Sequence, residues 1–109
     1  MVDVNKVTKD SANLLVEEIE TTIQNYTEES IRSLDKQRYL AQKRQLLVSA
    51  FGKTSGGMTQ LIIKDLITDI DQELAHFDEL ARYCNQYREY YTGILKVVKE
   101  AIEELKILQ

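Results

Sequence analysis

The second half of this sequence carries an apolar repeat that leaves few choices of fold. From residue 63 onward, apolar side chains follow one another by alternating steps of three and four residues, the spacing of a helix that packs along one side. The members of this heptad row are Ile63, Leu66, Ile70, Glu73, Phe77, Leu80, Cys84, Tyr87, Tyr91, Ile94, Val98, Ala101, Leu105 and Leu108. Glu73 alone interrupts the row with a charge. The pattern predicts one long helix over about 58–108.

A rougher repeat in the first half predicts a second long helix over about 6–50, which Asp10 or Ser11 could cap. Proline is absent from the sequence, and this absence favours long uninterrupted helices. The apolar row slips in its middle, where the sequence SLDKQRYLAQKRQ is polar for a packed helix. Its members are Ala12, Val16, Ile19, Ile23 and Tyr26, followed after the slip by Leu34, Ala41 and Val48.

The stretch FGKTSGG at 51–57 separates the two repeats and holds three of the four glycines. Glycine readily adopts the backbone conformations that end a helix and reverse the chain. We therefore expect an all-α fold, a single domain over 1–109 in which two long helices form an antiparallel hairpin. The turn would contain Phe51, Gly52, Gly56 and Gly57.

The distribution of charge supports the hairpin independently. A chain that reverses at about residue 54 places residue i opposite roughly residue 108 minus i. A basic stretch of the first helix (Arg32, Lys36, Arg38, Lys43, Arg44) then faces an acidic stretch of the second (Asp65, Asp69, Asp71, Glu73, Asp78, Glu79). Complementary blocks favour this arrangement, although each exposed ion pair contributes less than about 1 kcal/mol.

The apolar surface of the second helix is wider than one neighbouring helix can cover, because rows on both sides of the heptad row are also largely apolar. We expect two hairpins, identical or not, to pair as a four-helix bundle, or a longer helical partner to cover the surface. The alternative is a kink near Gly93 that folds the last segment back into a three-helix monomer. The predicted partner-binding residues are Tyr83, Tyr90, Ile94, Leu95, Val97, Val98, Ile102 and Leu105.

The sequence offers weak candidates for chemistry. Glu73 and His76 form the Glu-x-x-His motif of di-metal helical bundles, but a pair between Glu73 and Lys36 or Arg38 accounts for the carboxylate without a metal. His76 and Cys84 lie two helical turns apart, about 12 Å, too far for a nucleophile and its base. We therefore predict no catalytic residue, no metal site and no cofactor, and a protein that is not an enzyme.

Composition limits the partners and the compartment. The net charge of -4 argues against nucleic-acid binding, which needs a basic surface. A single cysteine excludes an intramolecular disulfide and favours a reducing compartment. The first residues lack the apolar core of a signal peptide, and no apolar run approaches a membrane span. We expect a soluble cytoplasmic protein, with secretion by a route that needs no cleavable signal as the alternative.

A helical hairpin of about 100 residues with Phe51-Gly52 at its midpoint resembles the WXG family of type VII secretion proteins, and also the small helical proteins that accompany LXG toxins. The resemblance implies a homo- or heterodimeric four-helix bundle that acts as a secreted partner or targeting chaperone. The chain has no tryptophan, and no tyrosine is followed four positions later by an acidic residue in the stretch 83–95, so it resembles the member that lacks the export signal.

Two main functional hypotheses are compatible with the sequence. The first is a non-enzymatic helical adaptor or chaperone for another helical protein, with a type VII secretion toxin as one candidate, in which Leu95→Asp or Ile102→Asp abolishes the complex and spares helicity. The second is a homodimeric inhibitor or immunity-type protein that uses the acidic surface of residues 65–79. A metalloprotein built on Glu73 and His76 is a third, weaker one.

Overall fold

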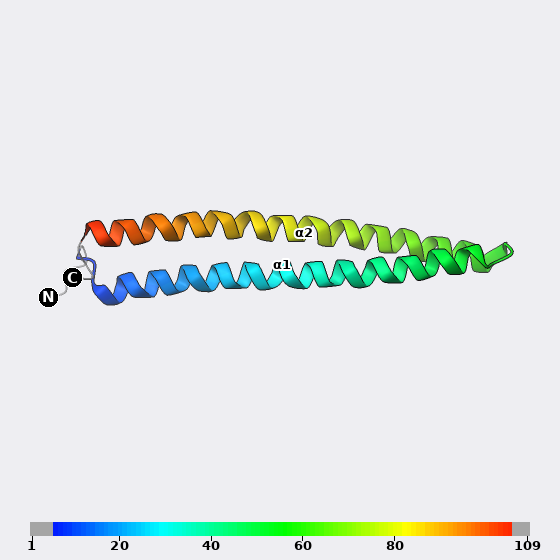
Figure 1. The fold of residues 1–109 in the computed structure, drawn as a ribbon, viewed down its shortest axis with the longest axis horizontal. Helices are drawn as coiled ribbons and strands as arrows, with labels where there is room; N and C mark the ends of the chain where they lie inside the picture. The colour runs from blue at the N-terminus through cyan, green and yellow to red at the C-terminus, as the bar shows by residue number, and fades with distance from the viewer. Residues whose placement is uncertain (1–5, 106–109) are drawn as a thin grey trace. The chain divides into compact units, whose positions relative to one another are not determined.

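The structure, a computed structural model, describes residues 6–105 and contains two long helices that run in opposite directions (Figure 1). α1 spans Lys9–Gly52 and α2 spans Gly57–Glu104, and residues 53–56 join them. This arrangement confirms the predicted antiparallel helical hairpin. The predicted helix bounds, about 6–50 and 58–108, differ from these by a few residues, and Leu108 lies outside the described residues.

The start of α1 is capped two or three residues earlier than the sequence suggested. The Oγ1 atom of Thr8 accepts a hydrogen bond of 3.1 Å from the backbone N–H of Ser11, and Thr8 O accepts the N–H of Ala12. Thr8 therefore occupies the N-cap position that we assigned to Asp10 or Ser11. Asp10 lies in the first turn, where the positive end of the helix dipole stabilises its carboxylate.

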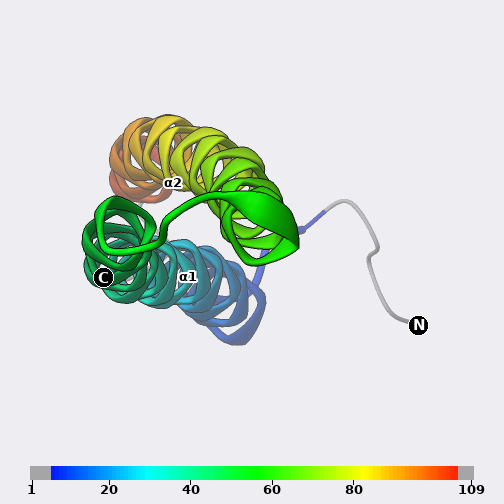
Figure 2. The same ribbon diagram turned by 90° about the vertical axis from the view of Figure 1, so that its right-hand side faces the viewer.

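The turn, residues 53–56, is shorter than the glycine-rich stretch 51–57 from which it was predicted (Figure 2). Phe51 and Gly52, which we expected in the turn, belong to the last turn of α1. The helix ends there because the backbone N–H groups of Lys53 and Thr54 donate hydrogen bonds to the carbonyls of Ala50 and Phe51, three residues earlier in each case. Gly56 and Gly57 then adopt φ values of +97° and +80°, which residues with a Cβ atom rarely adopt.

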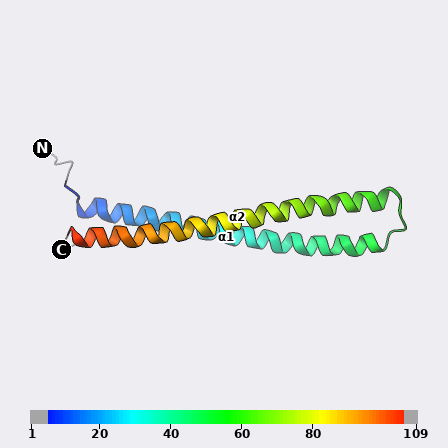
Figure 3. The same ribbon diagram turned by 90° about the horizontal axis from the view of Figure 1, so that it is seen from above.

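The hairpin divides into two compact units, and each helix contributes to both. Unit 1 contains the described residues 6–28 and 84–105, so it joins the first part of α1 to the last part of α2. Unit 2 is Glu29–Tyr83, in which the rest of α1 and the rest of α2 run on either side of the turn (Figure 3).

The row of α1 that packs on α2 runs along its length without a slip, contrary to our prediction. Side chains at alternating steps of four and three residues are buried or half-buried, whereas Leu34, Ala41 and Val48, the predicted continuation, are exposed. The sequence did not predict this continuous row because the side chains in its middle are polar or small. Its members are Ala12, Val16, Ile19, Ile23, Tyr26, Ser30, Ser33, Gln37, Leu40, Arg44, Leu47 and Phe51.

The packed row of α2 is also displaced from the predicted one. Only eight of the thirteen predicted members that the structure describes are buried or half-buried, because the helix turns a neighbouring row toward α1. The other five are exposed: Leu66, Glu73, Ile94, Ala101 and Leu105. The observed row is Ile63, Ile67, Ile70, Leu74, Phe77, Ala81, Cys84, Arg88, Tyr91, Leu95, Val98 and Ile102. This choice leaves the short Glu73 side chain in water and half-buries Arg88, whose long apolar stem can lie along a packed surface.

The pairing of the two helices is offset from the prediction by one heptad. Arg44 bonds to Asp71, whereas reversal at about residue 54 would have placed it near residue 64. In unit 1, the Tyr26 ring lies 5.9 Å from the rings of both Tyr87 and Tyr91, a pairing with the same offset. An offset of seven residues keeps the same faces in contact, so the basic stretch still meets acidic residues.

α2 continues through Gly93, so the alternative in which a kink there folds the chain into three helices is wrong. A Cβ atom at Gly93 would meet nothing within 4 Å. Within residues 6–105, neither helix contains an apolar stretch of the length and character needed to cross a membrane.

Candidate functional site

Four tyrosines gather in unit 1 and extend from the helix interface to the surface. Tyr26 of α1 stacks on Tyr87 and Tyr91 of α2, and Tyr87 meets Tyr90 edge to face at a centroid distance of 5.7 Å. The Tyr90 hydroxyl accepts a hydrogen bond of 2.7 Å from Nε2 of Gln86. The ring of Tyr90 is therefore held from two sides although 54% of the residue is exposed.

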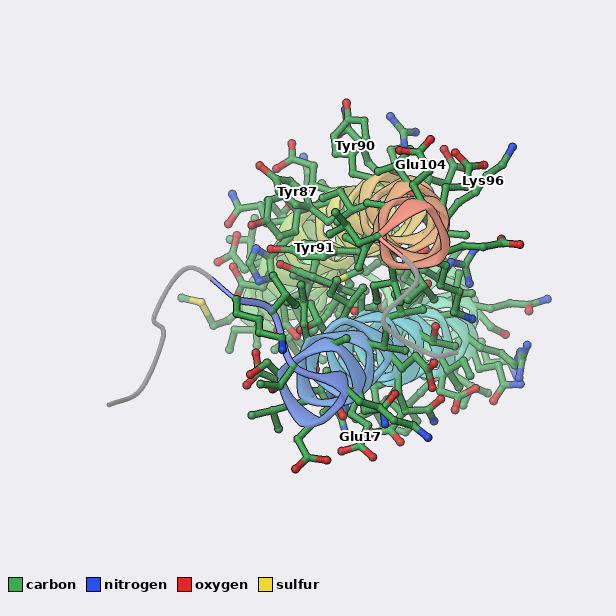
Figure 4. The ribbon with its side chains drawn as sticks, turned by 90° about the vertical axis from the view of Figure 1, so that its left-hand side faces the viewer. Glu17, Tyr87, Tyr90, Tyr91, Lys96 and Glu104 are labelled. Atoms are coloured by element: carbon green, nitrogen blue, oxygen red, sulfur yellow. The ribbon has the colours of Figure 1, made fainter. Side chains whose placement is uncertain are left out.

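Tyr90 begins an exposed apolar row on α2, which we call the docking row and define as Tyr90, Ile94 and Val97. Their exposed fractions are 54%, 42% and 57%. The steps of four and three residues place all three on one side of the helix. Figure 4 shows Tyr91 directed between the helices of unit 1 and Tyr90 directed away from α1. Unit 1 thus presents an apolar face that its own two helices leave uncovered.

The other predicted partner-binding residues fall into two groups. Ile102 is buried, with 7% exposed, and Leu95 and Val98 are half-buried, so all three belong to the packed row of α2 and help to hold the hairpin together. Leu105 is 62% exposed just beyond the end of α2, and Tyr83 is 48% exposed in unit 2. The docking row is what remains of the predicted set as an exposed, regularly spaced face of unit 1.

Unit 2 carries a groove between its two helices, which we call the turn-end groove. The residues that line it are Lys43, Leu46, Leu47 and Ala50 from α1 and Leu66, Asp69, Ile70 and Glu73 from α2. Leu46 is 73% exposed and Leu66 is 45% exposed at its rims. The sequence did not point to this groove, because Leu66 was assigned to the packed row of the second helix. With the observed row known, the spacing places both leucines beside it.

Beside the groove, one ion pair links the helices of unit 2. The Arg44 guanidinium donates two hydrogen bonds to the Asp71 carboxylate, from Nε at 2.5 Å and from the terminal nitrogen at 3.3 Å. The hydrogen bond, and then the charge, of Asp71 raise the pKa of Arg44. Both side chains are nearly half exposed, so water screens the attraction and the pair adds little to stability.

Other ion pairs between described residues lie within one helix: Arg32–Glu29, Arg38–Asp35 and Arg82–Asp78. Arg38 and Lys36, the predicted partners of Glu73, contact other residues. Arg38 bonds to Asp35 at 3.4 Å, and the Lys36 ammonium lies 5.6 Å from the centre of the Tyr39 ring. Lys43 shares the turn-end groove with Glu73.

The residues considered for metal or nucleophilic chemistry are dispersed. Glu73 and His76 are both exposed, and the His76 ring contacts its neighbour Phe77 at 5.3 Å. Cys84 is a buried free thiol in the packed row of α2. Over residues 6–105, the structure brings no three His, Cys, Asp or Glu side chains into a cluster that could hold a metal ion.

Comparison with known proteins returns no match of any of the three kinds. No family model matches the chain, no curated protein matches it, and no solved structure matches it.

Proposed function

We propose that this chain is a non-enzymatic helix-binding protein, an adaptor or targeting chaperone, that docks an amphipathic helix of another protein on the docking row. The observation that carries the proposal is the regular exposure of Tyr90, Ile94 and Val97 on unit 1. Side chains at this spacing on one helix are the contacts that a second helix uses when it packs alongside.

The state of Tyr90 supports its role as the principal contact. Tyrosine is enriched among the residues that contribute most to protein interfaces, because it buries a large ring and loses little side-chain entropy. The contact with Tyr87 and the hydrogen bond from Gln86 already restrict the Tyr90 side chain before a partner arrives. Restriction in the free protein lowers the entropic cost of binding.

The expected partner is a helix with an apolar side about two turns long. The resemblance to small type VII secretion proteins makes the helical N-terminal domain of an LXG toxin one candidate for that helix. The competing hypothesis, an inhibitor that presents the acidic surface of residues 65–79, is less well supported, since Asp71 and Asp78 are already paired with Arg44 and Arg82.

The first experiment uses a photo-reactive phenylalanine analogue at Val97 in cells of the source organism. The cross-linked protein is identified, purified and titrated against the full chain by calorimetry. We expect Ile94→Asp and Val97→Asp to weaken binding at least about tenfold, or about 1.4 kcal/mol, because a carboxylate would be desolvated against apolar side chains. Helical content by circular dichroism should stay close to that of the wild type.

Thr92→Asp is the matched control, since it adds the same charge at an exposed position of the same helix and outside the docking row. We expect this variant to bind like the wild type. Unchanged affinity of both Ile94→Asp and Val97→Asp would refute the docking row as the binding face. A partner whose cross-linked segment is not helical would refute the proposed mode of binding.

A further inference from the structure

The turn-end groove of unit 2 has rims of opposite charge. Lys43 stands on the α1 side, and Asp69 and Glu73 stand on the α2 side. The ion pairs that the structure shows between described residues do not involve these three side chains, although Arg44 and Asp71 close by are paired. The groove therefore offers charges of both signs that take part in none of the ion pairs shown between residues 6 and 105.

The floor and rims of the groove also carry apolar side chains that a partner could bury. Leu47, Ala50 and Ile70 line it between the helices, and Leu46 and Leu66 stand exposed at either side. An apolar groove with charged rims is typical of a surface that packs against other helices, where the apolar contacts supply affinity and the charges select orientation.

We propose that the occupant of the turn-end groove is the same groove of a second copy of this chain, with the turns of both copies at the same end. Rotation by 180° about an axis parallel to the helices sets α1 of each copy against α2 of the other at the same level. Lys43 of each copy then meets Asp69 and Glu73 of the other, and Leu46 packs near Leu66 of the other. The contact occurs twice and is self-complementary.

The charges exclude the competing orientation of two copies. Rotation about an axis perpendicular to the helices sets α1 against α1 and α2 against α2, which brings Lys43 toward the basic stretch of the other copy and Glu73 toward Asp69 and Glu73. Like charges placed opposite one another at an interface disfavour the wrong orientation. A helix of a foreign protein would need an acidic rim and a basic rim at matching positions, and this chain already carries both.

Charge reversal tests the proposal by the mass in solution. The wild-type chain should elute with twice the mass of its 12.6 kDa monomer in size exclusion with light scattering. Lys43→Glu places acidic groups opposite acidic groups, and the double variant Asp69→Lys, Glu73→Lys places basic groups opposite basic groups, so each variant alone should raise the dimer dissociation constant at least about tenfold. An equal mixture of the two variants should recover the dimer as a heterodimer.

The mixing experiment distinguishes a contact between two copies from a contact within one copy. Each variant keeps like charges on both rims of its own groove, so a contact inside one chain cannot be restored by mixing. Lys64→Glu, an exposed reversal on α2 that does not line the groove, is the control and should dimerise like the wild type. Circular dichroism establishes that all variants remain helical.

A monomeric wild-type chain at micromolar concentration would overturn the proposal, and so would either charge-reversal variant if it dimerised alone as well as the wild type. A mixture that stays monomeric would overturn the shared orientation of the turns. None of these outcomes bears on the proposed function, because the docking row lies in unit 1 and is tested by Ile94→Asp and Val97→Asp.

Discussion

At the scale of single residues, the least expected side chains are the polar ones in the packed row of α1. Ser33 is 2% exposed and Ser30 is 4% exposed, in a unit whose only other helix is α2, so their burial must come from that helix. The Oγ atom of Ser33 is buried without a hydrogen-bond partner in the structure. Small residues there permit close approach of the two backbones, and a buried hydroxyl without a partner reduces stability.

Ser33→Ala should raise the free energy of unfolding by about 1 kcal/mol, because it removes a desolvated hydroxyl and adds a better helix former of similar size. The measurement is urea unfolding followed by circular dichroism. Ser49→Ala, at an exposed position of the same helix, should change stability by at most about 0.5 kcal/mol. A destabilised Ser33→Ala protein would show that the hydroxyl makes a stabilising interaction.

At the scale of elements, α2 differs from α1 in being apolar on two sides. One row packs on α1, and a neighbouring row contains Leu66 and Ile94, which remain exposed at 45% and 42%. A helix with two apolar rows can satisfy one in the hairpin and keep the other for a further contact. The same property explains why its packed row could not be chosen from spacing alone.

The two kinds of glycine in α2 should respond oppositely to alanine. Gly93 lies within the helix with open space around a new Cβ, so Gly93→Ala should stabilise the protein by about 0.5–1 kcal/mol. Gly57 begins the helix at φ +80°, so Gly57→Ala should destabilise it by about 1–2 kcal/mol. Thermal and urea unfolding of both variants measure the difference, and a stabilised Gly57→Ala protein would contradict the positive φ at the turn.

At the scale of the whole molecule, the pairing of the helices is set by their packed rows and not by the length of the turn. Unit 1 and unit 2 show the same offset, because Tyr26 lies midway between Tyr87 and Tyr91 in one and Arg44 bonds to Asp71 in the other. Both rows have the same alternating steps, so a shift smaller than a heptad would place polar residues against apolar ones.

Insertion of four Gly and Ser residues after Ser55 should therefore be tolerated. Doubling the length of a flexible loop costs only about 0.6 kcal/mol in closure entropy, and the packed rows still select the same pairing. We expect unchanged helical content and a small fall in the urea midpoint. A loss of several kcal/mol would mean that the turn itself determines the pairing.

The two long helices were predictable because the heptad spacing and the absence of proline extend over many residues. The turn, and with it the opposite directions of the helices, was predictable from the glycines. The choice between neighbouring rows was not, since Leu66, Leu80 and Ile94 are as apolar as Leu74, Leu95 and Ile102. The central part of α1 was hidden because Ser30, Ser33, Gln37 and Arg44 look like surface residues in a sequence.

The candidate site was predictable to a similar degree. The excess of apolar surface on α2 marked Tyr90, Ile94 and Val97, whose exposure depends only on the helix having more than one apolar side. The assignment of Leu95, Val98 and Ile102 required the choice of row, and the turn-end groove required the pairing offset. Charge blocks could not supply that offset, because the basic stretch faces acidic residues in either pairing.

The tyrosine cluster also gives the molecule a built-in optical probe. The chain has no tryptophan, so its near-ultraviolet emission comes from six tyrosines, and four of them, Tyr26, Tyr87, Tyr90 and Tyr91, belong to unit 1. Intrinsic fluorescence therefore reports mainly on that unit, whereas far-ultraviolet circular dichroism reports on both. If the two signals change together during unfolding, the two units melt as one cooperative structure, and if emission changes separately, each unit has a stability of its own.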